Sequence, residues 1–181
     1  MSDFFAPQIK EEFEKESVKR LNSQILPLPE KQFVGVFVGD QLFGFPVLKV
    51  QDVLKQHDIT PVPCAHPEIV GALNLRGRIA TAIDVRICLG LPALTNLSKT
   101  MHVVVTSRGE LYSLLVDRVW DVLNLPDHQF EPIPSTLDPL WRRVSSGIYR
   151  MKKDLFFILN VDALLDYQEQ KTETEEKTTA E

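Results

Sequence analysis

Residues 49–54 read KVQDVL, and residues 118–123 read RVWDVL. Aligned without gaps, the two copies share three apolar positions and one aspartate, Asp52 or Asp121, and each begins with a basic residue. The pattern suits a strand whose valines point inward and whose aspartate lies at the rim or caps the next turn. A repeat of this length indicates one structural step that the chain uses twice.

A second pair of similar stretches follows the two copies. Residues 78–91 and 156–167 each run from an apolar strand through an aspartate, Asp84 or Asp162, into a short apolar helix. Two related strand sets of this size predict two small five-stranded barrels placed side by side, because closing a sheet hides the edges of short strands.

The region between the two ends of the chain is mainly β by its pattern. Its apolar residues come in runs of Val, Ile, Phe and Tyr bounded by Gly, Asp, Asn, Lys or Pro. Turn residues at 39–40, 76–77 and 107–110 separate pairs of these runs and predict antiparallel hairpins. Helical spacing is confined to short pieces, at residues 66–74, 84–91 and 161–170.

Composition predicts one soluble globular unit or two small lobes that share a core. The chain has 181 residues, of which 44% are hydrophobic and 25% charged, with a net charge of −5. This balance gives no basic footprint for nucleic acid or for an anionic membrane. No apolar run is long enough to cross a bilayer, and the first residues lack the pattern of a signal peptide. We therefore expect a cytoplasmic protein with no direct membrane insertion and no nucleic-acid partner.

The two ends differ from the middle. Residues 1–32 are charged and then proline-punctuated, which predicts an N-terminal extension and linker, with Phe5, Ile9 and Phe13 spaced as on a short amphipathic helix. Residues 167–181 are rich in glutamate and lack large apolar side chains, which predicts a disordered acidic tail. The folded domain is expected over residues 33–166.

No motif points to catalysis, to a metal or to a cofactor. The chain has no nucleophile elbow, phosphate loop or dinucleotide fingerprint, and its histidines are scattered, at 57, 66, 102 and 128. Cys64 and Cys88 lack the spacing of a zinc site and are expected to be small hydrophobes. Three aspartates stand at strand ends, where turn or N-cap bonds to backbone N–H groups explain them: Asp84, Asp117 and Asp162.

Arg76 and Gly77 form the most distinctive turn, because they follow Asn-Leu and lead directly into a strand. The forked guanidinium of Arg76 suits either a partner's carboxylates and carbonyls or an internal salt bridge, and the residues alone do not decide between the two. Gly77 is expected to have a positive φ.

The stretch NLRGRIATAIDVRICLGLP (74–92) resembles the central motif of CheW domains, the adaptor modules of bacterial chemotaxis arrays. The resemblance extends upstream through residues 33–54 and 59–77, and downstream through LYSLLVDRVWDVLNLP, FEPIP and ILNVDALL. It covers about residues 33–166. It implies two intertwined five-stranded SH3-like barrels with short helices and a core between them. It also implies a non-enzymatic adaptor that couples chemoreceptor cytoplasmic tips to the CheA histidine kinase, in arrays at the inner membrane.

Site residues follow from the same resemblance. It implies a receptor-binding groove for a helical tip, formed by Val50, Asp52, Gly71, Arg76 and Gly77. It implies a kinase-binding surface with candidates Val34, Val47 and Val53, for which packing in the barrel core is an equally good interpretation.

Two alternatives remain open from the sequence. An accessory CheW-like scaffold of a non-flagellar pathway, with pili or another output, would have the same pattern. A small-barrel peptide-binding module is the other, since small barrels serve many functions.

Overall fold

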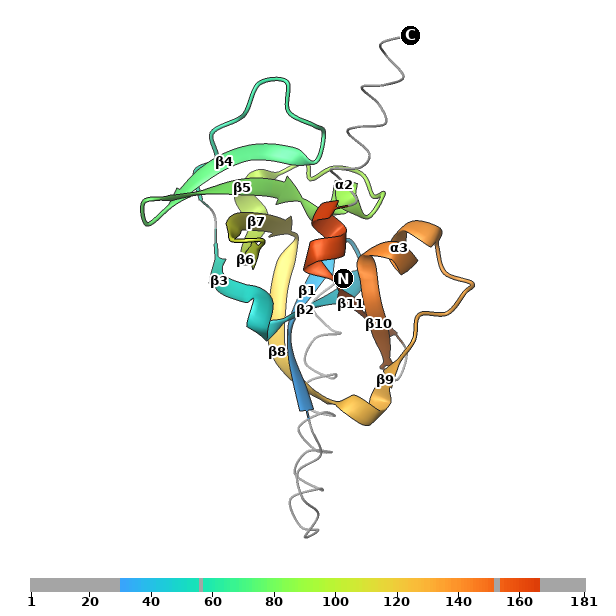
Figure 1. The fold of residues 1–181 in the computed structure, drawn as a ribbon. Coiled ribbons are helices and arrows are strands. Elements are labelled where there is room, and N and C mark those ends of the chain that lie inside the picture. Colours follow the sequence, from blue (N-terminus) through green and yellow to red (C-terminus); the bar gives the residue numbers. More distant parts are fainter. Residues whose placement is uncertain (1–29, 56, 152–153, 167–181) are drawn as a thin grey trace.

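The structure is a computed structural model that describes residues 30–55, 57–151 and 154–166. Most of these residues lie in two β-sheets, one above the other in Figure 1. The first sheet has the order β8-β1-β2-β11-β10-β9, and the second has the order β3-β6-β7-β5-β4. The strands are β1 (Glu30–Val38), β2 (Gln41–Pro46), β3 (Val50–Leu54), β4 (Ile69–Leu75), β5 (Arg78–Asp84), β6 (Met101–Ser107), β7 (Glu110–Val116), β8 (Arg118–Pro126), β9 (Phe130–Glu131), β10 (Ser145–Arg150) and β11 (Leu155–Leu159).

The two sheets share one arrangement of five strands. In each, an antiparallel hairpin, β1-β2 or β6-β7, pairs on one side with β8 or β3. On the other side the hairpin pairs in parallel with β11 or β5, which in turn pairs with β10 or β4. The two-residue β9 adds a sixth strand to the first sheet. Because β3-β4-β5 join the hairpin of the second half of the chain, and β8-β10-β11 join that of the first, the halves are intertwined.

The two hexapeptides are the places where the chain crosses between the sheets. Residues 49–54 follow β2 through the 3-10 helix η1 (Val47–Lys49) and pair, as β3, with β6 of the second sheet. Residues 118–123 follow β7 through Asp117 and pair, as β8, with β1 of the first sheet. The sequence repeat therefore marks the same crossing in each half.

Both crossing strands carry a β-bulge within the repeated residues. In each, the aspartate carboxylate accepts a hydrogen bond from the next backbone N–H: Asp52 from Val53 at 2.9 Å, and Asp121 from Val122 at 2.8 Å. A bulge disrupts the ladder locally, and the short aspartate side chain bonds the local backbone there.

The valines of the two copies do not all point inward as predicted. Val50 and Val119 pack against the central core, whereas Val53 and Val122 are 36% and 53% exposed. The prediction was wrong for the second valine of each copy, because a bulge separates it from the first valine and interrupts the regular alternation of the strand.

Three clusters of buried apolar side chains hold the fold together. One belongs to the first sheet and contains Phe33, Leu42, Leu123, Leu125, Tyr149, Phe156 and Ile158. A second belongs to the second sheet and contains Leu73, Ala80, Ala82, Val104, Leu111 and Leu115. The largest joins the two, with side chains from β1, β2, β5, β6, β7, β10 and β11. Each sheet thus curls over its own small core while sharing the central one.

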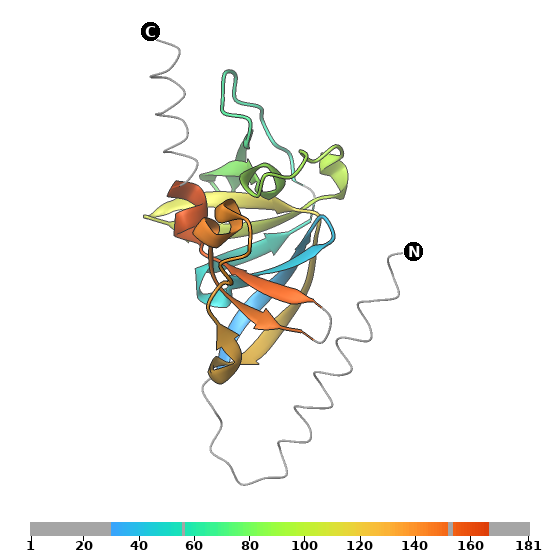
Figure 2. The same cartoon turned by 90° about the vertical axis from the view of Figure 1, so that its right-hand side faces the viewer.

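Short helices cover the junction of the two sheets. They are α2 (Val85–Cys88), α3 (Pro139–Val144) and the helical residues 161–166, with single 3-10 turns η2 (Leu97–Lys99) and η3 (Asp127–Gln129) elsewhere. Figure 2 shows α3 beside residues 161–166 at the level between the sheets. Trp141 of α3 packs its ring 5.3 Å from those of Phe43 and Phe157, and its indole N–H donates to the Leu89 carbonyl at 3.0 Å.

The helix starts confirm one predicted cap and correct the predicted correspondence. The carboxylate of Asp84 accepts the backbone N–H of Arg86 at 2.9 Å and caps α2. The second helix begins after Asn160, whose side chain accepts the N–H of Ala163 at 3.1 Å. The counterpart of Asp84 is therefore Asn160 and not Asp162, since each of the two directly precedes the first residue of its helix.

Residues 66–74 do not form the predicted helix, because β4 begins at residue 69 within them. The short helices predicted near 84–91 and 161–170 are present in the described residues, at 85–88 and 161–166. The helix predicted around Phe5, Ile9 and Phe13, and the predicted tail at 167–181, lie outside the described residues. Within the described part, no helix has the length and apolarity needed to cross a membrane.

Candidate functional site

Asp52 and Arg76 meet at one end of the second barrel. Asp52 lies in β3 and Arg76 in the turn between β4 and β5, so the strands that carry them stand at opposite ends of the sheet order. The Arg76 Nη2 donates to Asp52 Oδ2 at 3.2 Å, which shows that the sheet curls until these ends approach. The Arg76 side chain is 90% exposed and that of Asp52 is 37% exposed, so most of the guanidinium faces solvent.

The turn that carries Arg76 has a left-handed backbone at both central residues. The φ angles are 53° for Arg76 and 85° for Gly77, as expected for a two-residue hairpin turn, and the N–H of Gly77 donates to the Asn74 side chain at 2.8 Å. The β6–β7 turn repeats this geometry with Arg108 at 50° and Gly109 at 86°. Gly77 thus has the predicted conformation, and Arg108 provides an arginine in a matched backbone setting.

Gly71 places the loop that precedes β4. The N–H of Ala72 donates to the carbonyl of Thr60 at 2.8 Å, and the Thr60 N–H donates back to Ala72 at 2.8 Å. A Cβ on Gly71 would lie 2.3 Å from the Thr60 carbonyl oxygen. The absence of a side chain at Gly71 therefore lets this loop close against β4.

The structure brings three of the five predicted receptor-facing residues together on the surface: Asp52, Arg76 and Gly77. Val50 is half-buried against the central core, and Gly71 is buried under the loop at Thr60. These two shape the strands that carry the exposed group.

The predicted kinase-facing valines differ in how much surface they offer. Val34 is 5% exposed in the central core, and Val47 packs against that core from η1. Val53 is 36% exposed, and Leu48, next to Val47, is 95% exposed. Between Val47 and Val53 along the chain, the exposed apolar surface therefore comes from Leu48 and Val53, and sequence reasoning did not single out Leu48.

An ion pair that sequence reasoning missed holds the first crossing. Lys49 Nζ donates to Asp162 Oδ2 at 2.8 Å, and the Ser107 hydroxyl donates to Asp162 Oδ1 at 2.6 Å. The hydrogen bond from Lys49, followed by that from Ser107, lowers the pKa of the Asp162 carboxyl. No local spacing signals this contact, because Asp162 lies 113 residues after Lys49.

A second ion pair holds the other crossing. Arg86 reaches Asp117 with Nη2 to Oδ1 at 2.7 Å and Nε to Oδ2 at 3.0 Å. The same carboxylate accepts the N–H of Gly39 at 2.7 Å. The hydrogen bond to Asp117 raises the pKa of the Arg86 guanidinium against the cost of its burial. Asp117 thus connects the crossing to α2 and to the β1–β2 turn. The sequence predicted only bonds to backbone N–H groups for Asp117, whereas its carboxylate also binds Arg86.

Among the described residues, no three His, Cys, Asp or Glu side chains gather as a metal site would require. Of the two cysteines, Cys88 is buried and Cys64 is exposed, so the expected hydrophobic role holds for Cys88 alone.

Comparison with known proteins identifies the family. The model of the CheW-like domain matches residues 32–169. This chain belongs to the CheW-like domain family.

The relatives cover most of the chain. The chemotaxis protein CheW of Helicobacter pylori is 27% identical over 164 residues, which are 87% of this chain and 96% of that protein. CheW of Thermotoga maritima is 28% identical over 139 residues, 77% of this chain and 90% of that protein. The crystal structure of the scaffolding protein CheW from Thermoanaerobacter tengcongensis matches with a TM-score of 0.67 and 26% identity, covering 79% of this chain and 92% of that one.

These findings confirm the predicted fold and the predicted role as an adaptor or scaffold. The CheW fold of paired SH3-like barrels is the fold of this chain, with β9 as an added short strand. CheW-family proteins are chemotaxis adaptors and scaffolds rather than enzymes, and this chain has that scaffold role.

Proposed function

We propose that this CheW-family protein couples the cytoplasmic tips of chemoreceptors to a CheA-type histidine kinase, within receptor arrays at the inner membrane. The observation that carries the proposal is the contact between Asp52 and Arg76, at 3.2 Å, which joins the two separate motifs that the resemblance assigns to receptor binding.

The receptor tip is expected to bind as a helix against the second barrel. Val50 and the strands held by Gly71 would form the apolar side of the groove, while Asp52 and Arg76 would form its charged rim. Arg76 has guanidinium donors beyond the one used by Asp52, so it can bind a partner's carboxylate or carbonyl without leaving Asp52 unpaired. This joins the two interpretations of Arg76 that the sequence left open.

The kinase is expected to bind a different surface of the protein. Val53, with 36% of its surface exposed, is the candidate for direct contact, and Val47 and Val34 would support it from the core. Coupling two partners through one rigid adaptor raises the effective concentration of each near the other, so no catalytic step is needed.

The experiment is a pull-down with the purified protein against a receptor cytoplasmic fragment and a CheA-type kinase. Asp52→Ala and Arg76→Ala are expected to weaken receptor binding about tenfold or more while kinase binding stays unchanged. Arg108→Ala is the matched control, because Arg108 has the same backbone conformation in a hairpin turn of the same sheet. Equal effects of Arg76→Ala and Arg108→Ala would refute the assigned groove.

A second candidate is an accessory scaffold of a different pathway. Protein PilI of Pseudomonas aeruginosa is 28% identical to this chain over 111 residues, 59% of this chain and 62% of that protein. Pull-downs with kinases and receptors from each chemosensory set of the source organism would distinguish this candidate, since only one set should be retained. A small-barrel peptide-binding module would instead retain none of them.

A further inference from the structure

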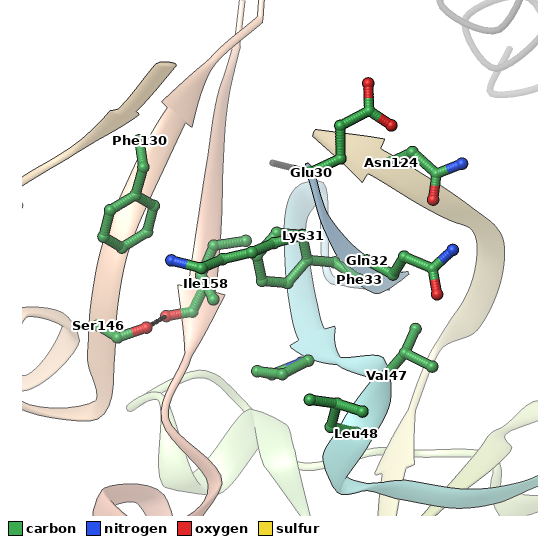
Figure 3. A pocket seen from close by; sticks show the side chains of 11 residues that line it. Glu30, Lys31, Gln32, Phe33, Val47, Leu48, Asn124, Phe130, Ser146 and Ile158 are labelled. Carbon is green, nitrogen blue, oxygen red and sulfur yellow. Dashed lines mark hydrogen bonds between the residues drawn. The ribbon is translucent and has the colours of Figure 1, made fainter. Parts of the chain in front are cut away.

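A pocket of about 720 Å³ opens at the beginning of β1. Figure 3 shows side chains from several strands converging on it. Its lining is largely apolar, with polar side chains among it: Glu30, Lys31, Gln32, Phe33, Pro46, Val47, Leu48, Asn124, Phe130, Ser146 and Ile158. Pockets of about 300–1,000 Å³ with such a lining are typical binding sites.

The positive charge in the pocket, on Lys31, already has a partner. Lys31 Nζ lies 2.8 Å from Asp127 Oδ1 and 5.4 Å from the centre of the Phe130 ring. An occupant therefore does not have to bring a carboxylate for Lys31. The pocket favours an apolar occupant, because covering Leu48, which is 95% exposed, removes a large apolar side chain from water.

The chain itself supplies a suitable apolar segment a short way before the pocket in the sequence. Residues 1–29 directly precede Glu30, which lines the pocket. Phe5, Ile9 and Phe13 recur every four residues, so in a helix they would share one face about 12 Å long. The intervening residues 14–29 can span up to about 50 Å when extended, so this face can reach the pocket on the same molecule.

We propose that residues 5–13 dock as an amphipathic helix in this pocket, with Phe5, Ile9 and Phe13 packed against Leu48 and its apolar neighbours. Val47, a candidate kinase-facing residue, also lines the pocket. Docking would then compete with the kinase for this surface, a consequence that rests on the proposed function, whereas the docking itself does not.

Disulfide trapping in the full-length chain tests the contact. In a Cys64→Ser background, which leaves only the buried native thiol of Cys88, one variant carries Ile9→Cys with Leu48→Cys. The matched control carries Ile9→Cys with Ile79→Cys, because Ile79 is 66% exposed but lies on β5 of the other sheet. We expect the Leu48 pair to form a monomeric disulfide at least tenfold faster than the control pair.

Further variants test whether the apolar face is responsible. Adding Phe5→Ala and Phe13→Ala to the Leu48 pair should slow trapping to the control rate, whereas adding Glu11→Ala and Glu14→Ala, off the apolar face, should not. Equal trapping at Leu48 and Ile79 would overturn the proposal, and so would predominantly dimeric products, which would indicate the segment of a second copy.

The trapping assay contains no kinase, so it fails or succeeds independently of the proposed function. If trapping succeeds, Phe5→Ala with Phe13→Ala should also raise the affinity for the kinase. Successful trapping with no kinase binding by any variant would leave the docking intact and refute the proposed function.

Discussion

His102 is a buried residue whose ionisation the fold constrains. It is 1% exposed on β6, and its Nδ1 lies 2.9 Å from the Ser113 hydroxyl on β7. Burial, and secondarily the charge of His57, lowers the pKa of His102. The folded protein therefore holds this imidazole neutral at pH values where an unfolded chain would protonate it.

This arrangement predicts a loss of stability in mild acid. Because the pKa of His102 is lower in the folded state, its contribution is fully present above its ordinary value of 6.5 and decreases as the pH falls below it. Urea titrations between pH 7.5 and 5.5 should show a falling free energy of unfolding for the wild type. His102→Gln, which keeps a polar partner for Ser113, should flatten that dependence; equal slopes would contradict the account.

Gly71 is a residue that backbone packing requires. Gly71→Ala would place a methyl group 2.3 Å from the Thr60 carbonyl oxygen and displace the loop that bonds Ala72. We expect a loss of about 1–3 kcal/mol in unfolding free energy, as for an overpacked site. Chemical denaturation measures it, with Gly109→Ala as a control at a glycine that also has a positive φ but has open space around it. A smaller effect at Gly71 than at Gly109 would contradict this account.

Single residues were predictable where their role is local. The positive φ of Gly77 and the cap at Asp84 follow from turn and helix-start chemistry within a few residues. The contacts of Asp162 with Lys49 and Ser107 were not predictable, because they depend on how distant strands cross.

At the scale of elements, the two crossings are held by ion pairs of opposite polarity. At the crossing before β3, the crossing segment supplies the cation, Lys49, and the helix at 161–166 supplies Asp162. At the crossing before β8, the crossing segment supplies the anion, Asp117, and α2 supplies Arg86. The Arg86 pair is bidentate and its side chains are 25% and 27% exposed, against 44% and 41% for the Lys49 pair. Solvent therefore screens the Lys49 pair more strongly.

This difference in exposure predicts that losing each ion pair lowers the free energy of unfolding by a different amount. Arg86→Ala should lower the unfolding free energy by about 1.5–3 kcal/mol, because it removes two charge-assisted bonds from a partly buried carboxylate. Lys49→Ala should cost under about 1 kcal/mol. Thermal or urea unfolding at low and high salt measures both, and a larger cost for Lys49→Ala would contradict the comparison.

The sequence pattern predicted the strands well, with β4 as the exception. The alternation and bounding turns of the apolar runs follow from the two-residue period of a strand. Residues 69, 70, 72, 73 and 75 are apolar and also fit a helical period, so residues 66–74 were assigned wrongly. These residues form a strand because they pair with β5, and the local sequence pattern carries no information about that pairing.

At the scale of the whole molecule, the exchange of strands makes each half dependent on the other. The first half supplies β1-β2 to one barrel and β3-β4-β5 to the other, and the largest core lies between the barrels. The internal repeat predicted two related barrels, but the exchange itself was implied only by the family resemblance.

Dividing the chain between α2 and β6 should therefore yield two fragments that do not fold alone. Residues 1–95 and 96–181 would each expose unpaired strand edges and parts of all three cores. We expect no cooperative thermal transition by circular dichroism for either fragment, and a transition after mixing equal amounts. A cooperative transition in one isolated fragment would contradict the intertwined architecture.

The most direct test of the central claim is a bridging measurement. An immobilised receptor cytoplasmic fragment is incubated with a CheA-type kinase, with and without this protein, and the retained kinase is quantified. If the protein couples receptor to kinase, it should increase kinase retention at least severalfold, Arg76→Ala should abolish the increase and Arg108→Ala should not. Unchanged retention in the presence of the wild-type protein would contradict the claim that it couples receptor to kinase.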